Sequence, residues 1–354
     1  MQLGIVGLPM VGKSTVFQLL TGSENAGFSV GKSQSAMARI PDRRIDHLSS
    51  VYRPKKTSYA QLEVVDIPGL VPGTEKGSNV FLDSIRRADA LLHVVRAFDD
   101  QSVASMHSGI DPLRDLEVIA YELLISDMDL IEKRIERINN NKKKSQMQDE
   151  LDLLLRLQGV LDEEKALSSA ELNGEEERMM SGYQFLTLKP LILCVNINED
   201  EITAPAYPQR DALLQFCRER QMPLIEMSAE IERQLLAFDG EERTEFMNDL
   251  GLAESGVDKI ARGIYERLGL ISFFTVGEDE VKAWTIEKGC HAKAAAGKIH
   301  SDIERGFIRA EVFAYDDYVR YGTTSALREQ GLLRLEGKEY EVKDGDIVHF
   351  RFNV

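Results

Sequence analysis

The chain has 354 residues, of which 43% are hydrophobic and 29% are charged. These proportions are typical of a folded protein with room for two or three domains, and they exclude an intrinsically disordered chain. The formal net charge of −16 disfavours broad, non-specific binding to a nucleic-acid backbone, so we expect no DNA partner.

The strongest motif lies at the N-terminus. An apolar run over Leu3–Val6 is long enough for a buried strand but too short for a helix. It leads into Gly7–Ser14, which has the complete pattern G-x-x-x-x-G-K-S, and the residues from Thr15 onwards continue without a helix breaker. This strand–loop–helix context predicts a nucleotide-phosphate site. The alternative, a glycine turn before an ordinary helix, is disfavoured by the completeness of the pattern.

Each fixed position of this loop has an expected role. Gly7 and Gly12 allow backbone angles that let successive N–H groups point at one anion. Lys13 reaches the terminal phosphates, and the Ser14 hydroxyl ligates Mg²⁺. The residues of the loop that we expect to contact the nucleotide are Gly7, Met10, Val11, Gly12, Lys13, Ser14 and Thr15.

A second phosphate motif follows the next predicted strand, 60–65. Asp66-Ile67-Pro68-Gly69 stands at the carboxyl end of that strand, where ligands bind in open α/β sheets. We expect Asp66 to hold Mg²⁺ through water and the Gly69 N–H to face the γ-phosphate. Leu70 occupies the position where many hydrolysing relatives place a glutamine, and leucine cannot orient the attacking water. Catalysis therefore needs another polar group or is slow.

Two segments stand where signalling proteins of this type carry mobile switches. The Gly- and Ser-rich segment 26–36 offers the hydroxyls Ser29, Ser33 and Ser35 but no clear threonine ligand for a metal. A flexible loop without a metal role is an equal alternative for it. The residues 71–79 are typical of a second switch.

Two histidines follow these segments. His93 lies within a predicted buried strand over 90–95, where a histidine is more often part of the core than catalytic. His107, in the polar loop 99–111, is the better candidate for a catalytic imidazole.

The region 113–185 changes to Leu, Ile and Met with dense charge. Apolar residues step by three and four on both sides of the polar stretch 139–144, which predicts an antiparallel coiled-coil hairpin. The first seam consists of Tyr121, Leu124, Met128, Ile131, Ile135 and Ile138. The tip lysines 142–144 are candidates for contact with RNA phosphates, and a solvated tip is the alternative.

A candidate base-recognition motif follows the predicted strand 190–195. Guanine-specific relatives read Asn-Lys-x-Asp here, and the aspartate accepts hydrogen bonds from guanine N1–H and N2–H₂. This chain reads Asn196-Ile197-Asn198-Glu199, so the carboxylate is one methylene longer and the lysine is missing. Both changes weaken guanine discrimination, while Asn196 can still meet adenine. Ser228-Ala229, at the end of strand 224–229, would lie beside the base.

Beyond a helical pattern over 246–268, short strands alternate with Gly-rich turns. The expected strands are 272–276, 281–286, 308–313, 339–342 and 347–352, with helical segments over 293–297 and 299–303. This pattern predicts a small mixed β domain of the ubiquitin-like grasp type, with a continuation of the main sheet as the alternative.

The expected fold class is therefore α/β with three parts. A nucleotide-binding domain with a mostly parallel sheet covers 1–112 and 186–271. A helical coiled-coil insertion covers 113–185, and the β-grasp domain covers 272–354.

Taken together, the motifs resemble the YchF-type, Obg-like ATPase family over essentially the full length. The residues that carry the resemblance are Gly-Leu-Pro-Met-Val-Gly-Lys-Ser-Thr (7–15), Val-Asp-Ile-Pro-Gly-Leu-Val (65–71), His-Val-Val-Arg-Ala-Phe-Asp-Asp (93–100), Asn-Ile-Asn-Glu (196–199), Gly-Phe-Ile-Arg-Ala-Glu-Val (306–312) and His-Phe-Arg-Phe-Asn-Val (349–354). The resemblance implies a P-loop G-type domain, a coiled-coil insertion and a C-terminal TGS domain. It also implies a hydrolase that prefers ATP over GTP and is associated with ribosomes and translation.

Three departures from the family pattern concern the phosphate end of the site. Met10 replaces an asparagine of the family loop, and Val30 stands where the family carries its Mg²⁺-ligating threonine. A histidine that the family carries aligns with Ser105, and His107 lies two places later.

We predict an Mg²⁺-dependent nucleoside triphosphate hydrolase that prefers ATP, acts as a slow switch and has a ribosome or RNA as partner. The expected catalytic residues are Lys13, Asp66, Gly69 and His107, and K⁺ is a further candidate cofactor. A GTPase served by Glu199 is one alternative. A nucleotide-gated binding protein with negligible turnover, favoured by Leu70 and Val30, is the other.

The cysteines and the lack of long apolar runs bear on location. Cys194, Cys217 and Cys290 have neither paired nor metal-ligand spacing, which is typical of a reducing compartment. No apolar run approaches the roughly 20 residues needed to cross a bilayer, and the N-terminus does not resemble a signal peptide. We therefore expect a cytoplasmic protein without membrane contact.

Overall fold

The computed structural model describes residues 1–23, 33–70, 75–100, 109–238 and 240–353. Two compact units make up the chain: 1–36 with 63–260, and 37–62 with 261–354. The sequence pattern does not indicate that residues 37–62 belong with the C-terminal unit. The domain boundaries drawn from the sequence stay a prediction.

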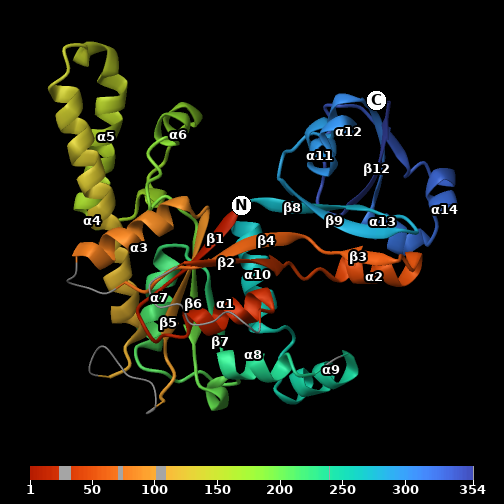
Figure 1. Ribbon diagram of the computed structural model, residues 1–354, viewed down its shortest axis with the longest axis horizontal. Coiled ribbons are helices and arrows are strands. Elements are labelled where there is room, and N and C mark those ends of the chain that lie inside the picture. The colour runs from red at the N-terminus through yellow and green to blue at the C-terminus, as the bar shows by residue number, and fades with distance from the viewer. Residues whose placement is uncertain (24–32, 71–74, 101–108, 239, 354) are drawn as a thin grey trace. The chain divides into compact units, whose positions relative to one another are not determined.

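A six-stranded sheet with the order β2-β4-β1-β5-β6-β7 forms the centre of the first unit (Figure 1). Its strands are β1 (Gln2–Val6), β2 (Gln34–Arg39), β4 (Gln61–Asp66), β5 (Ala90–Arg96), β6 (Leu191–Asn196) and β7 (Leu224–Met227). All pairs from β4 to β7 are parallel. The carboxyl ends of these strands therefore meet at one edge of the sheet, which confirms the predicted α/β class.

Helices of the first unit follow the strands or project from them. They are α1 (Lys13–Thr21), α3 (Glu75–Arg87), α4 (Pro112–Asn139), α5 (Gln148–Asp162), α6 (Gly174–Met180), α7 (Arg210–Glu219), α8 (Ala229–Leu235) and α9 (Gly240–Asp249), with α10 (Gly256–Arg267) running to the second unit. The single helix expected over 246–268 is wrong, because Gly251 adopts φ +68° and the Ser255 hydroxyl accepts from Asp258 N–H at the start of a new helix.

Helices α4 and α5 form the predicted hairpin (Figure 1). Its buried side chains include Ile131, Ile138, Leu154 and Leu157. Tyr121 does not lie in this seam, because its side chain is exposed and its hydroxyl contacts Glu164.

A buried carboxylate holds the base of the hairpin. Asp127 of α4 accepts hydrogen bonds from the Leu186 and Thr187 N–H groups at 2.9 and 2.8 Å and from the Thr187 hydroxyl at 2.8 Å. Its neighbour Ser126 accepts from Arg86 of α3 at 2.9 Å. The hairpin is thus fixed both to the segment that enters β6 and to α3.

A second six-stranded sheet, with the order β11-β10-β12-β8-β9-β3, organises the second unit. Its strands are β3 (Lys56–Ser58), β8 (Leu270–Thr275), β9 (Glu280–Glu287), β10 (Phe307–Ala314), β11 (Arg334–Glu336) and β12 (Asp346–Phe352). The helices are α2 (Arg43–Tyr52), α11 (Ala292–Ile299), α12 (Ser301–Arg305), α13 (Tyr315–Tyr321) and α14 (Thr324–Glu329). The strand expected over 339–342 is wrong, because Glu341 makes only an isolated bridge to His291.

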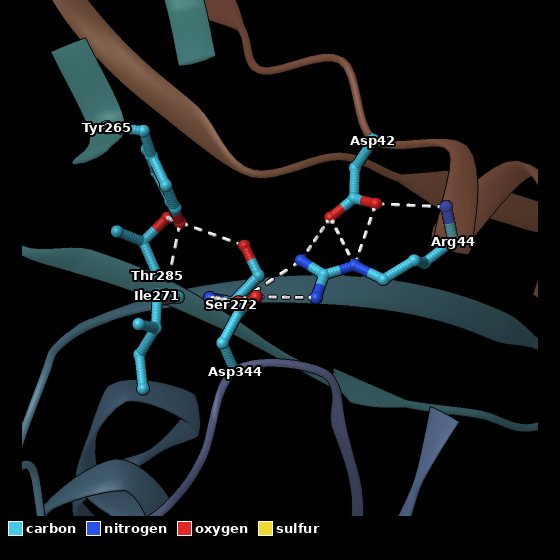
Figure 2. A network of polar contacts seen from close by, with 7 residues as sticks. All are labelled: Asp42, Arg44, Tyr265, Ile271, Ser272, Thr285 and Asp344. Carbon is cyan, nitrogen blue, oxygen red and sulfur yellow. Dashed lines mark hydrogen bonds and ion pairs between the residues drawn. The ribbon is translucent and has the colours of Figure 1, made fainter. Parts of the chain in front are cut away.

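A polar network joins the segment 37–62 to the rest of this unit (Figure 2). The Arg44 guanidinium donates to the carboxylates of Asp42 and Asp344. Asp344 also accepts from Ser272 N–H, and the Ser272 hydroxyl contacts Tyr265. Strand β3 pairs in parallel with β9. Residues far apart in sequence therefore build one sheet.

None of the helices in the described parts of the chain combines the length and the apolar character required of a membrane span.

Candidate nucleotide-binding site

The loop between β1 and α1 has the close packing that its glycines predict. Gly7 has φ +151°, and a Cβ atom there would lie 2.4 Å from the Val94 carbonyl oxygen. Gly12 has φ +98°, and a Cβ atom there would lie 2.5 Å from Asn196 Nδ2. Both the backbone angle and the lack of space exclude other side chains at these two positions.

Lys13 is the buried cation of the loop. Its side chain is only 8% exposed, and Nζ donates to the Leu8 carbonyl oxygen at 2.7 Å. Burial lowers the pKa of Lys13 from 10.5 to about 8, and the nearby charge of Asp66 opposes that shift. In the structure the Lys13 amine is therefore held by the neutral Leu8 carbonyl group. A phosphate anion bound beside the amine would raise its pKa again, because it favours the charged form.

The two expected metal ligands face each other. The Ser14 hydroxyl donates to Asp66 Oδ2 at 2.6 Å, and burial raises the pKa of Asp66 while Ser14 and Lys13 oppose the rise. In the described parts of the chain no cluster of three or more His, Cys, Asp or Glu side chains forms a metal site. One hydroxyl and one carboxylate fit Mg²⁺, which takes its other ligands from phosphates and water.

The Asp66–Gly69 turn packs directly on the phosphate loop. A Cβ atom on Gly69 would lie 3.0 Å from both Lys13 Nζ and the Pro9 backbone nitrogen. The next side chain, Leu70, is fully buried. Leu70 therefore faces the core and presents nothing to a water molecule.

Asn196 joins the phosphate loop to the predicted base-recognition segments. Its side chain is 5% exposed. Nδ2 donates to the Val11 carbonyl oxygen at 3.2 Å, and Oδ1 accepts from Ala229 N–H at 3.1 Å. Ser228 is buried, and its hydroxyl caps α8 by accepting from Ile231 N–H. The amide expected to meet adenine is thus largely committed to the backbone of its neighbours.

The rest of the Asn-Ile-Asn-Glu segment divides between core and surface. The Ile197 side chain is buried in a cluster with Val195 and Tyr207, so we do not place it on a base. Glu199 is exposed, and its Oε2 accepts from Gln234 Nε2 at 2.9 Å.

Of the two candidate histidines, the structure describes only His93. His93 is buried in β5, and neither ring nitrogen has a hydrogen-bond partner among the described residues. Burial, with a smaller effect of Lys13, lowers its pKa to about 3, so His93 is a neutral core residue. His107, Ser105 and Val30 lie outside the described residues.

Sequence reasoning missed two contributors to this edge of the sheet. Arg96 follows the apolar run of β5 and donates to the carbonyl oxygens of Phe98 and Asp100. An arginine at the carboxyl end of a buried strand was a usable signal for it. Gln234, five residues into the helix that follows β7, carried no such signal.

A parallel sheet, a glycine-built anion loop at a helix N-terminus, and a buried lysine beside a Ser–Asp pair define a P-loop nucleotide-binding protein of the G type.

Comparisons with known proteins agree with that class. A family profile described as 50S ribosome-binding GTPase matches residues 2–197. The profile of the YchF-GTPase C-terminal family, described as a protein of unknown function, matches residues 270–353. The chain is 41% identical to the ribosome-binding ATPase YchF of Bacillus subtilis and 39% identical to that of Haemophilus influenzae. Each alignment covers 99% of this chain and 99% of the relative.

A solved structure of the Schizosaccharomyces pombe YchF GTPase matches with a TM-score of 0.88 and 34% identity, over 99% of this chain and 97% of that chain. The chain belongs to the YchF family, as the motifs predict.

Proposed function

We propose that this protein is an Mg²⁺-dependent ATPase that acts as a slow switch on the ribosome. The observation that carries the proposal is the convergence of Lys13, Ser14 and Asp66 at the phosphate loop, to which Asn196 is hydrogen-bonded. The relatives' names, ribosome-binding ATPase and YchF GTPase, support both the reaction and the partner.

Phosphoryl transfer in such a site relies on positioning and charge stabilisation rather than on covalent chemistry. The loop N–H groups would hold the phosphates, Lys13 would move from the Leu8 carbonyl to the terminal phosphates, and Gly69 N–H would face the γ-phosphate. Ser14 and Asp66 would hold Mg²⁺, which neutralises charge on the phosphate oxygens when bound. His107 stays the candidate for a catalytic imidazole.

A preference for ATP is part of the proposal. Guanine presents two N–H donors and needs two acceptor oxygens, whereas adenine presents one acceptor and one donor on the same edge. The segment that would recognise the base carries Glu199 in place of the shorter aspartate and a buried Ile197 in place of lysine. A GTPase served by Glu199 is the rival within the same class.

A second candidate function is a nucleotide-gated binding protein with negligible turnover. The fully buried Leu70 favours it, because no side chain at that position orients an attacking water.

The proposal includes a cytoplasmic location and a ribosomal or RNA partner. The exposed lysines 142–144 at the hairpin tip are one surface that would meet RNA phosphates, in a way that weakens with salt. K⁺ is a further candidate cofactor.

Phosphate release from ATP and GTP tests the reaction. The full chain is assayed with and without Mg²⁺, K⁺ and ribosomes. We expect slow, Mg²⁺-dependent release that is faster with ATP than with GTP. Release from GTP alone would favour the GTPase, and binding without release under every condition would favour the nucleotide-gated binding protein.

A further inference from the structure

The Gln234 side-chain amide on α8 donates a hydrogen bond to the Glu199 carboxylate, which is the group that a guanine base would need. Gln234 Nε2 donates to Glu199 Oε2 at 2.9 Å. An ionised carboxylate only accepts hydrogen bonds, so the nitrogen of the Gln234 amide must face Glu199.

The backbone around Asn196 fixes the positions of both partners. Asn196 ends β6, and Glu199 follows it in the 3₁₀ turn Glu199–Glu201. The Asn196 side chain accepts from the N–H of Ala229, the first residue of α8. The buried Asn196 side chain therefore connects the start of the 3₁₀ turn to the start of α8. The contact between Glu199 and Gln234 is a second connection between the same two elements.

This contact has different consequences for the two purines. A carboxylate that recognises guanine must turn both oxygens toward N1–H and N2–H₂, whereas the hydrogen bond from Gln234 to Oε2 holds the Glu199 carboxylate turned toward α8. Adenine carries no N1–H, so it does not require the bidentate acceptor.

We propose that Gln234 is a specificity-determining positioning residue, which disfavours guanine by holding the Glu199 carboxylate. The inference rests on the proposed function, because it assumes that a base lies beside residues 196–199.

Nucleotide affinities of single variants provide the test. Equilibrium dissociation constants for fluorescent ATP and GTP analogues are measured on the full chain with Gln234→Ala and Gln234→Leu. We expect the ratio of the GTP to the ATP constant to fall about three- to ten-fold, because GTP gains one charge-assisted hydrogen bond.

The chain offers a matched control for surface chemistry. Gln215 of α7 donates to Glu219 at the same distance, 2.9 Å, on an exposed face. Gln215→Ala removes a glutamine–glutamate contact of the same kind away from residues 196–199, and we expect the GTP to ATP ratio to stay unchanged.

A double variant tests whether Gln234 acts through Glu199. In the Glu199→Ala background, Gln234→Ala should not alter the ratio further. An unchanged ratio in Gln234→Ala, or an equal fall with and without Glu199, would overturn the inference while ATP binding by the wild type still upheld the proposed function. Failure of the wild type to bind ATP would overturn both.

Discussion

Arg44 and Asp344 are 300 positions apart in the sequence, and the Arg44 guanidinium donates to the Asp344 carboxylate at 2.7 and 3.1 Å. The same guanidinium donates to Asp42, the residue that caps α2. Together with the pairing of β3 on β9, this contact makes residues 42–58 a structural part of the C-terminal unit.

Replacing Arg44 should destabilise that unit. In Arg44→Ala, the largely buried carboxylate of Asp42 and the exposed carboxylate of Asp344 lose their shared cation. We expect the free energy of unfolding to fall by about 1–3 kcal/mol. The only tryptophan of the chain, Trp284, lies in β9 and stacks on Phe273. Its fluorescence during denaturation therefore reports on the unfolding of this unit.

The control for Arg44→Ala is an exposed ion pair in the same unit. Lys55 and Asp279 are 82% and 86% exposed, so Lys55→Ala should change stability by less than about 0.5 kcal/mol. Equal effects of the two substitutions would contradict the role given to the Arg44 network.

Loss of the buried carboxylate at the hairpin base should have a local effect. In Asp127→Ala, the N–H groups of Leu186 and Thr187 are left buried without an acceptor, at a cost of about 2–4 kcal/mol. Amide hydrogen exchange of a peptide over 183–189 should become markedly faster. Unchanged exchange there would show that these N–H groups find other partners.

Lys13 links stability to pH in the nucleotide-free protein. Its pKa is about 8 in the folded chain and 10.5 when unperturbed. Below pH 8 both folded and unfolded states hold the proton, so the full cost of burying the charge is present. Between pH 8 and 10.5 the unfolded state binds more protons, and the stability of the wild type therefore rises with pH.

The matching variant is Lys13→Met, which keeps the volume and removes the charge. Without nucleotide, it should be more stable than the wild type below pH 8, by up to about 3 kcal/mol. The difference should shrink as the pH rises from 8 to 10.5. A difference that stays constant over this range would contradict the burial of a charged amine.

Met10 occupies a backbone conformation that suits asparagine better. It has φ +65° and a side chain that is 54% exposed, and asparagine tolerates this left-handed region at lower cost. Met10→Asn should raise the free energy of unfolding by about 0.5–1 kcal/mol. Met37→Asn, at an equally exposed methionine within strand β2, should give no gain, and a gain in both variants would point to hydrophobicity rather than backbone strain.

The phosphate end of the site was predictable because its requirements are local. Gly7 and Gly12 are fixed by backbone angle, and Asp66 follows a recognisable strand, so spacing alone places them at one edge of a parallel sheet. The base end depends on tertiary contacts instead. Nothing in the sequence indicates that the Asn196 side-chain amide is hydrogen-bonded to the backbone of Val11 and Ala229, or that the Ile197 side chain faces the core.

The same distinction explains the elements that the sequence analysis missed. Helix α2 has a local signal, since Asp42 follows Pro41 and caps the helix. Its assignment to the C-terminal unit has none, because that depends on Asp344 and on a three-residue strand, β3. The false strand at 339–342 has the right alternation but lacks a partner strand beyond one bridge.

Titration of the full chain with ATP in the presence of Mg²⁺ tests the central claim most directly. The wild type and Lys165→Ala, which removes an exposed lysine of the same unit, should bind ATP with equal affinity, and Lys13→Ala should lose binding. Undiminished ATP affinity in Lys13→Ala would contradict the assignment of the Gly7–Ser14 loop as the nucleotide site.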